Sequence, residues 1–180
     1  DLADPTGSAT GGRSTPTLLV LPRGHFFGGR TGSGYSFPAL TPLGAVDELV
    51  PDALARFGAE AGFQPSRGRL LLTAHSGGGA ALMAVLKHTD PDEVHAFDAL
   101  YGDPSPLIAW ARRRKPTGTG VLRVLYRARE GTAGNSEAVA RAVGADSPSW
   151  RVERTTVAHG GIPRTFGWRL LADGSADLPG

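Results

Sequence analysis

The sequence contains no cysteine, and this absence removes several classes of chemistry at once. A chain without thiols can form no disulfide, no thiolate nucleophile and no cysteine-ligated metal centre. Cysteine-free chains are compatible with both reducing and oxidising compartments, so we expect a soluble protein that is either cytoplasmic or secreted. No apolar run approaches the roughly 18 residues of a membrane-spanning helix, and we expect no signal peptide.

The chain also has little net charge and little lysine. Two lysines stand among 19 basic residues, and the formal net charge is +2. The excess of arginine, with abundant alanine and glycine, suggests a GC-rich bacterial genome. The densest basic run, Arg112 to Lys115, is typical of the last turn of a solvent-exposed helix. We therefore expect no nucleic-acid partner, because such a partner requires a broader basic surface.

The order of apolar segments predicts an α/β fold. Residues 1–16 are rich in small and polar residues and are expected to form a flexible lead-in or linker. Residues 17–174 have the length of one domain, and residues 175–180 are expected to be a tail. Strand-like runs alternate with helical patterns, which indicates a mostly parallel sheet with helices on both faces. The predicted strands are 17–21, 70–73, 93–100, 121–126 and 150–157, and the predicted helices are 46–63, 78–87, 105–114, 136–143 and 165–172.

Proline and glycine set three local expectations. Pro51 falls inside the helical pattern of residues 46–63, so we expect the helix to begin or kink there. Ser105, followed by proline, is the predicted N-cap of the helix over 105–114. The segment 26–37 (FFGGRTGSGYSF) is too irregular for a helical or strand period and is expected to be a loop.

The stretch LLLTAHSGGGAALMAVLKH, residues 70–88, places a serine between a strand and a helix. A strand that enters a helix through x-Ser-x must turn sharply, which exposes the serine Oγ above the sheet. The flanking residues must be small. The pentad Ala74 to Gly78 (AHSGG) meets this requirement, with alanine in place of the usual first glycine. The helix N-terminus would add positive potential behind Ser76, and the Gly77 N–H would be an oxyanion donor.

This arrangement resembles the nucleophile elbow of the α/β-hydrolase superfamily. The resemblance covers about residues 17–171 and rests on AHSGG, the alternation of strands and helices, and a late histidine. It implies a serine esterase or lipase-like hydrolase that cleaves a small-molecule or acyl ester through an acyl-enzyme, with Ser76 as nucleophile and no cofactor. An amidase or peptidase would use the same residues. The sequence gives no indication of the oligomeric state.

His159 is the predicted general base. It follows the last predicted strand in a glycine-rich loop (TTVAHGGIP), and it comes after Ser76, in the superfamily order of serine, acid and histidine. The other histidines fit less well. We expect His75 to point away from the site, packed under the elbow, and His88 and His95 to lie at the surface.

Two carboxylates compete to orient His159 and to stabilise its imidazolium. Asp98 ends the third predicted strand, and parallel sheets hold their functional groups at the carboxyl ends of their strands. Glu130 follows the next strand, which is the more usual place for the acid in the superfamily. Asp98 is preferred, with Glu130 as the rival and Asp103 as a third choice.

The origin of the second oxyanion donor is open. In the superfamily it comes from a loop that lies two βα units before the elbow, but only one clear helix separates residues 17–21 from Ser76. Either residues 17–21 are the donor strand, and a backbone N–H at Gly24, His25 or Phe26 closes the oxyanion hole, or the donor strand is missing from this chain.

The aromatic residues that follow residues 17–21 are the predicted substrate pocket. Phe26, Phe27 and Tyr35 could wall an apolar site for an acyl or aromatic group, or they could instead cover the edge of the sheet. No long insertion is present to form a lid, so we expect an open, shallow site.

A dinucleotide-binding domain is the main alternative. Gly77 and Gly79 follow a strand, and Asp98 comes about 20 residues later, roughly the spacing of the ribose-binding acid in that motif. Leu82, however, occupies the place of the third glycine, and His159 would have no role. A non-catalytic domain of the same fold is the third hypothesis, because the second oxyanion donor is unassigned.

Overall fold

The structure of the chain is a computed structural model, which describes residues 17–29, 32–144, 147 and 149–170. The strands are β1 (His25–Gly29), β2 (Gly32–Ser36), β3 (Leu71–His75), β4 (Glu93–Phe97), β5 (Val121–Arg127) and β6 (Trp150–Thr155). The helices are α1 (Ala45–Ala61), α2 (Gly79–Val85), α3 (Ser105–Arg114), α4 (Ala133–Val143) and α5 (Ile162–Leu170), with short 3₁₀ turns η1 (Ser76–Gly78), η2 (Lys115–Thr117) and η3 (His159–Gly161). The predicted lead-in over 1–16 and the tail over 175–180 lie outside the described residues.

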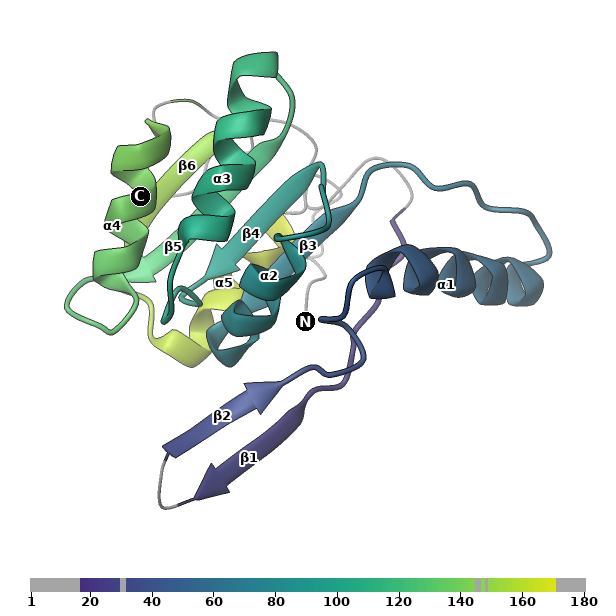
Figure 1. Cartoon of the computed structure of the whole chain (residues 1–180), viewed down its shortest axis with the longest axis horizontal. Coiled ribbons are helices and arrows are strands. Elements are labelled where there is room, and N and C mark those ends of the chain that lie inside the picture. The colour runs from purple at the N-terminus through teal and green to yellow at the C-terminus, as the bar shows by residue number, and fades with distance from the viewer. Residues whose placement is uncertain (1–16, 30–31, 145–146, 148, 171–180) are drawn as a thin grey trace.

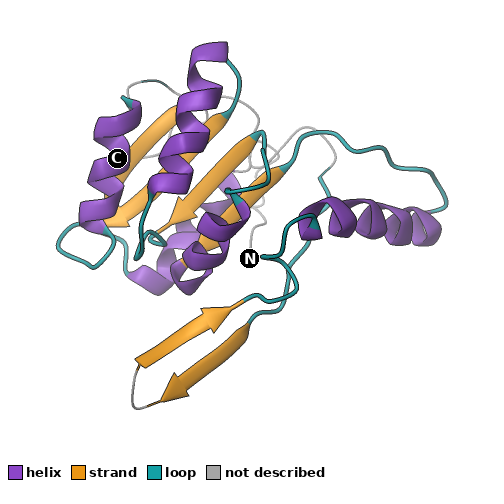
Figure 2. Ribbon diagram, viewed as in Figure 1, coloured by secondary structure: helices purple, strands orange, loops and turns teal. Residues whose placement is uncertain are grey.

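A four-stranded parallel sheet forms the centre of the molecule, with the strands in sequence order β3-β4-β5-β6 (Figure 1). Helices α2, α3 and α4 each connect one strand to the next. Because such crossovers are right-handed and the strand order runs in one direction, all three helices pack on the same face, as Figure 2 shows. Helix α5 follows β6 and packs on the opposite face. The predicted α/β class, a parallel sheet with helices on both faces, is therefore confirmed.

The two faces of the sheet carry cores of different size. Even-numbered strand residues, such as Ala96 and Val124, point toward α2, α3 and α4, where Trp110 and Leu107 complete the larger core. Odd-numbered residues point to the other face, where four buried residues form a small cluster: Phe97, Leu125, Ile162 and Phe166. This alternation follows from the two-residue period of a strand. The helix that follows His159 is thus attached to the sheet by the smaller core.

The prediction of a strand over residues 17–21 is wrong. This segment has no regular secondary structure and joins neither sheet. Its leucine and valine side chains are between 38% and 78% exposed, so the run is not buried either. An apolar run becomes a strand only where a sheet edge supplies partners for its backbone N–H and C=O groups. Consequently the sheet has four strands in the described residues, and β3, which leads to Ser76, lies at its edge.

The segment 26–37, predicted as a loop, is largely a β-hairpin. Strands β1 and β2 pair antiparallel, with Phe26 opposite Tyr35 and Phe27 opposite Gly34. The sequence signal is weak because glycine has low strand propensity and interrupts the alternation of side chains. In Figure 1 the hairpin lies beyond the carboxyl ends of the parallel strands, where the predicted site residues are.

The start of α1 and the N-cap of α3 differ from prediction. Helix α1 begins at Ala45 and contains Pro51, so the helix does not begin at the proline, and the predicted kink there stays a prediction. Helix α3 has Pro104 rather than Ser105 at its N-cap. The capping acceptor is instead Asp103, whose Oδ1 accepts hydrogen bonds from the Ser105 N–H (3.0 Å) and hydroxyl (2.6 Å). These hydrogen bonds lower the pKa of Asp103.

His95 was predicted to lie at the surface, but it is fully buried in β4. The prediction rested on its position near the end of a strand, whereas β4 is buried along its whole length. His95 Nδ1 lies 3.2 Å from Thr73 Oγ1, and Nε2 lies 3.4 Å from Glu93. On the next strand Arg123 is also buried, and this burial lowers its pKa to about 10. His88 is half-buried, and its Nε2 donates to the Thr41 carbonyl at 3.0 Å.

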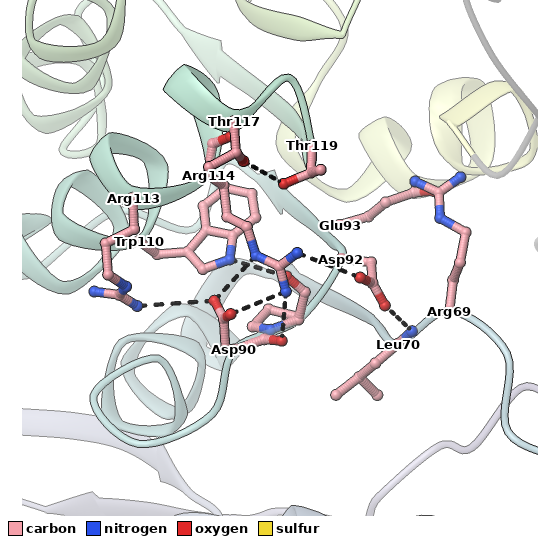
Figure 3. A network of polar contacts seen from close by, with 11 residues as sticks. Arg69, Leu70, Asp90, Asp92, Glu93, Trp110, Arg113, Arg114, Thr117 and Thr119 are labelled. Carbon is pink, nitrogen blue, oxygen red and sulfur yellow. Dashed lines mark hydrogen bonds and ion pairs between the residues drawn. The ribbon is translucent and has the colours of Figure 1, made fainter.

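A polar network ties the loop before β4 to the end of α3, at the amino end of the sheet (Figure 3). The Arg114 guanidinium lies 3.0 Å from Asp90 Oδ2 and 3.5 Å from Asp92 Oδ1, and it also donates to the Asp90 carbonyl at 3.0 Å. Beside it, the buried Trp110 indole donates to the Pro91 carbonyl at 3.0 Å. These contacts fix the amino end of β4 and leave its carboxyl end to present functional groups. Of the helices in the described part of the chain, none combines the length and apolarity that a bilayer crossing requires.

Candidate active site

Ser76 occupies the turn between β3 and α2 in a left-handed backbone conformation. Its φ is +53°, whereas His75 before it is extended with φ −123°. A non-glycine residue at positive φ costs about 1–3 kcal/mol and persists only where the surrounding structure enforces it. This strained turn at a strand-to-helix junction is the backbone geometry that presents a serine hydroxyl.

Close packing explains why the residues around Ser76 are small. A Cβ added to Gly79 would stand 1.7 Å from the Ala99 carbonyl oxygen, so the first turn of α2 can approach the β4 loop only with glycine there. A Cβ on Gly77 would stand 2.3 Å from the Tyr35 ring. Ala74, the alanine that replaces the usual glycine, is buried, and even a Cβ added to Gly78 would be at an ordinary contact distance of 3.7 Å from its side chain. The departure from the G-x-S-x-G pattern therefore creates no clash.

Asp98 and His159 are paired. His159 Nδ1 lies 2.7 Å from Asp98 Oδ2, although 61 residues separate them in sequence. Asp98 is 2% exposed, has φ +46° at the end of β4, and accepts a second hydrogen bond from the buried Thr132 hydroxyl at Oδ1. Because an ionised carboxylate can only accept, this pairing places the histidine proton on Nδ1 and leaves Nε2 free to accept a proton. His159 itself is 34% exposed, so that nitrogen can be reached.

The rival acids are engaged elsewhere. Glu130 is exposed and accepts a hydrogen bond from Arg127 at 2.8 Å. Asp103 caps α3 through Ser105. The structure thus brings Asp98 to His159 and leaves Glu130 and Asp103 outside the pair.

His75 was predicted to point away from the site, and this prediction is wrong. Its Nε2 donates to the His159 carbonyl at 3.0 Å, and the two imidazole rings are 4.6 Å apart and tilted by 32°. Burial lowers the pKa of His75, an effect partly opposed by its hydrogen bond to the His159 carbonyl. His75 is an odd-numbered residue of β3, so its side chain points to the face of the sheet that α5 covers, next to the β6–α5 loop. His75 therefore joins the nucleophile strand to the loop of the base.

Tyr101 is a site residue that sequence reasoning missed. Its ring lies 6.5 Å from the His159 ring at 70°, edge to face. Burial and the charge of Asp98 raise the pKa of Tyr101, and a side-chain hydrogen bond with Ser76 opposes this rise. Tyr101 thus lies beside both the serine and the histidine. The available sequence signal was its position three residues after Asp98, in FDALYG.

No hydrogen bond joins the described side chains of Ser76 and His159 directly. Two residues link them: His75, the residue before the serine, donates to the His159 carbonyl, and Tyr101 lies beside both Ser76 and His159. In proteins without substrate, hydrogen bonds of this kind are often long and shorten only in the substrate complex. The four side chains are therefore one cluster at the carboxyl edge of the sheet.

The two predicted oxyanion donors, Gly77 and His25, lie in different parts of the structure. Gly77 lies in the first turn of the helix, where backbone N–H groups have no intrahelical acceptor. His25 lies in β1, exposed and opposite Ser36. Because residues 17–21 do not join the sheet, they are not a donor strand beside β3.

The predicted pocket residues are on the hairpin. Tyr35 is 49% exposed, and its ring packs against Gly77. Phe26 and Phe27 lie in β1, but their side chains are outside the described part of the structure. The hairpin thus reaches the elbow through Tyr35.

The geometry disfavours the dinucleotide-binding alternative. Both carboxylate oxygens of Asp98 are engaged, by Thr132 and by His159, and neither is open to a ribose hydroxyl. Leu82, at the position of the third glycine, is a buried core residue. Among the described residues, no three His, Asp or Glu side chains are grouped so that they could hold a metal ion.

Comparison of the chain with known proteins identified no similar protein. Searches with the chain against protein-family models, curated proteins and solved structures gave no match in any of the three.

Proposed function

We propose that this protein is a serine hydrolase that cleaves carboxylic esters through an acyl-enzyme. One observation carries the proposal: a strained, left-handed Ser76 at a strand-to-helix turn shares one cluster with a buried Asp98–His159 pair. Activation of a serine hydroxyl requires a base beside the nucleophile and an acid that orients the base. Here the three groups follow the ends of three parallel strands. The proposal agrees with the resemblance of AHSGG to the α/β-hydrolase elbow.

In the first half-reaction Ser76 Oγ attacks the ester carbonyl carbon. His159 Nε2 accepts the hydroxyl proton, and Asp98 stabilises the resulting imidazolium through Nδ1. The carbonyl oxygen becomes an oxyanion that the Gly77 N–H stabilises. When the tetrahedral intermediate collapses, the bond to the alcohol breaks and His159 returns its proton to the departing alkoxide. Ser76 is then an ester of the acyl group.

In the second half-reaction water replaces the alcohol. His159 takes a proton from water, the hydroxide adds to the acyl carbon, and Ser76 departs as His159 returns the proton to Oγ. The products are a carboxylic acid and the free enzyme. An amide substrate would follow the same steps with an amine leaving group, so ester and amide hydrolysis are separated by assay.

Intact-mass labelling with a fluorophosphonate tests the proposal. We expect one adduct on the wild type, none on Ser76→Ala, and slow or no labelling of His159→Ala. Ser66→Ala is the matched control, because Ser66 is exposed and precedes β3 by several residues, and it should label like the wild type. Turnover of 4-nitrophenyl acetate should follow the same order. An unlabelled wild type would show that Ser76 is not activated and would refute the proposal.

A further inference from the structure

The proposed function requires a second oxyanion donor that the backbone does not supply in the expected way. Two donors usually hold the oxyanion, and loss of one typically costs 10²–10³ in rate. Gly77 provides one N–H. The other was expected from residues 17–21 or the turn after them, but these residues lie outside the sheet, and β3 is its edge strand.

Tyr101 lies on the loop after β4, beside both His159 and Ser76. Its phenol is near enough to Ser76 for the serine to oppose the rise in the pKa of Tyr101. Its ring meets His159 edge to face, with centroids 6.5 Å apart. A phenol is a hydrogen-bond donor of the kind that can form part of an oxyanion hole.

The loop that carries Tyr101 is held on both sides. Asn135 Nδ2 donates to the Leu100 carbonyl at 2.8 Å and to the Gly102 carbonyl at 2.7 Å, so the backbone before and after the tyrosine is fixed to α4. On the ring itself, a Cβ at Gly131 would stand 3.4 Å from Tyr101 Cδ1, so the Gly131 backbone lies against it. Tyr101 is 53% exposed, yet the backbone that carries it is held in place before substrate arrives. Such preorganisation is what makes a donor effective.

We infer that Tyr101 is a catalytic residue whose hydroxyl donates the second hydrogen bond to the oxyanion, in place of a backbone N–H. This inference rests on the proposed serine hydrolase function. In the free protein the phenol lies beside Ser76. The oxyanion is the former carbonyl oxygen of the substrate, bonded to the carbon that Oγ attacks, so it stands two bonds from Oγ and next to the phenol. The phenol proton stays on Tyr101 throughout, and no electron pair or leaving group passes through it.

The electrostatics of the phenol suit a donor. Partial burial and the nearby Asp98 charge raise the pKa of Tyr101. The hydroxyl therefore keeps its proton over the pH range in which a histidine serves as base.

The test compares Tyr101→Phe with Tyr126→Phe on a series of aryl acetates whose leaving groups range from 4-nitrophenol to phenol. Tyr126 is the matched control because its phenol also has a polar partner, Arg154 at 3.2 Å, but it lies on the buried face of β5. We expect Tyr101→Phe to lower kcat/KM by about 10²-fold or more for every ester, mainly through kcat. It should also weaken binding of an aryl trifluoromethyl ketone, whose serine adduct carries an oxyanion, by a similar factor. Tyr126→Phe should stay within about threefold of the wild type.

The outcomes separate this inference from the proposed function. Turnover and ketone affinity of Tyr101→Phe within about threefold of the wild type would overturn the inference, while Ser76-dependent labelling of the wild type would leave the hydrolase intact. A defect that grows as the leaving group becomes less acidic would assign the phenol to the leaving group and would equally overturn it. If the wild type were not labelled at all, both would fail together.

Discussion

Asp98→Asn is the substitution that tests the site most directly. The position has φ +46°, and asparagine is among the few side chains that adopt this backbone region readily, so the turn should be kept. The Thr132 hydroxyl can still donate to the new amide oxygen at the buried position. The amide nitrogen then faces His159 Nδ1, where a carboxylate oxygen lies 2.7 Å away in the wild type. Because that nitrogen is a donor, it holds the histidine in the tautomer with its proton on Nε2, which cannot accept the Ser76 proton.

The expected loss is about 10⁴ in kcat, the size seen when a triad aspartate becomes asparagine, which corresponds to about 5 kcal/mol of transition-state stabilisation. The assay is steady-state hydrolysis of 4-nitrophenyl acetate, with the rate of fluorophosphonate labelling as a second readout. Glu130→Gln is the matched control. Since Glu130 is exposed and paired with Arg127, it should stay within about threefold of the wild type. A variant at Asp98 that keeps more than a tenth of the activity, or a larger loss at Glu130, would refute the reasoning.

Three further predictions concern the stability of the fold. The lowered pKa of His75 means that the unfolded chain takes up a proton at this side chain at a higher pH than the folded chain, so stability should fall as pH drops below about 6.5. His75→Gln should reduce this loss, measured as urea midpoints at about pH 7.5 and about pH 5.5. Gly79→Ala should lower the free energy of unfolding by about 3 kcal/mol or more, because its Cβ would overlap a backbone carbonyl that cannot move away. Arg114→Gln should cost about 1 kcal/mol, since it removes several contacts of a mostly buried guanidinium.

Each of these has an internal comparison. An acid sensitivity that is unchanged in His75→Gln would show that another group is responsible. Gly134→Ala, at an open position in α4, should stabilise by about 0.5 kcal/mol and separates the clash at Gly79 from a general effect of glycine replacement. Arg113→Gln should lower the free energy of unfolding by less than about 0.3 kcal/mol. Arg113 lies 3.9 Å from Asp90, and both side chains are more than half exposed. Equal losses at Arg113 and Arg114 would contradict the role given to the network in Figure 3.

The parts of the fold that the sequence predicted are those in which local pattern and tertiary burial agree. Strands β4 and β5 are buried along almost their whole length, and α3 was predicted with both of its ends. Residues 17–21 show the limit of this logic, because the same apolar pattern produces no strand where no sheet edge receives it. The hairpin shows the opposite limit. There the backbone pairing of β1 with β2 is regular, but glycine hides it from any pattern of side chains.

The site was predictable to the level of residue type and order, and less so in its contacts. Ser76 and His159 follow from a strand–serine–helix junction and a late histidine. The choice between Asp98 and Glu130 depends on which strand end faces the β6–α5 loop, a distance between segments that sequence spacing does not contain. The position of Tyr101 depends on the direction of the chain after the left-handed Asp98, which only the structure gives. The contact of His75 depends on where the β6–α5 loop lies against β3, which sequence spacing does not contain either.

The unequal size of the two cores has a consequence for how activity should be lost on heating. Ser76 and Asp98 lie at the ends of strands that the larger core holds, whereas His159 lies between β6 and α5, and α5 is attached through the cluster of Phe97, Leu125, Ile162 and Phe166. Local opening of a segment costs less free energy than global unfolding when few buried contacts hold it. Helix α5 and the loop before it should therefore exchange amide hydrogens faster than the sheet. On this basis the proposed hydrolase activity should be lost through displacement of His159 at a lower temperature than that at which the sheet melts.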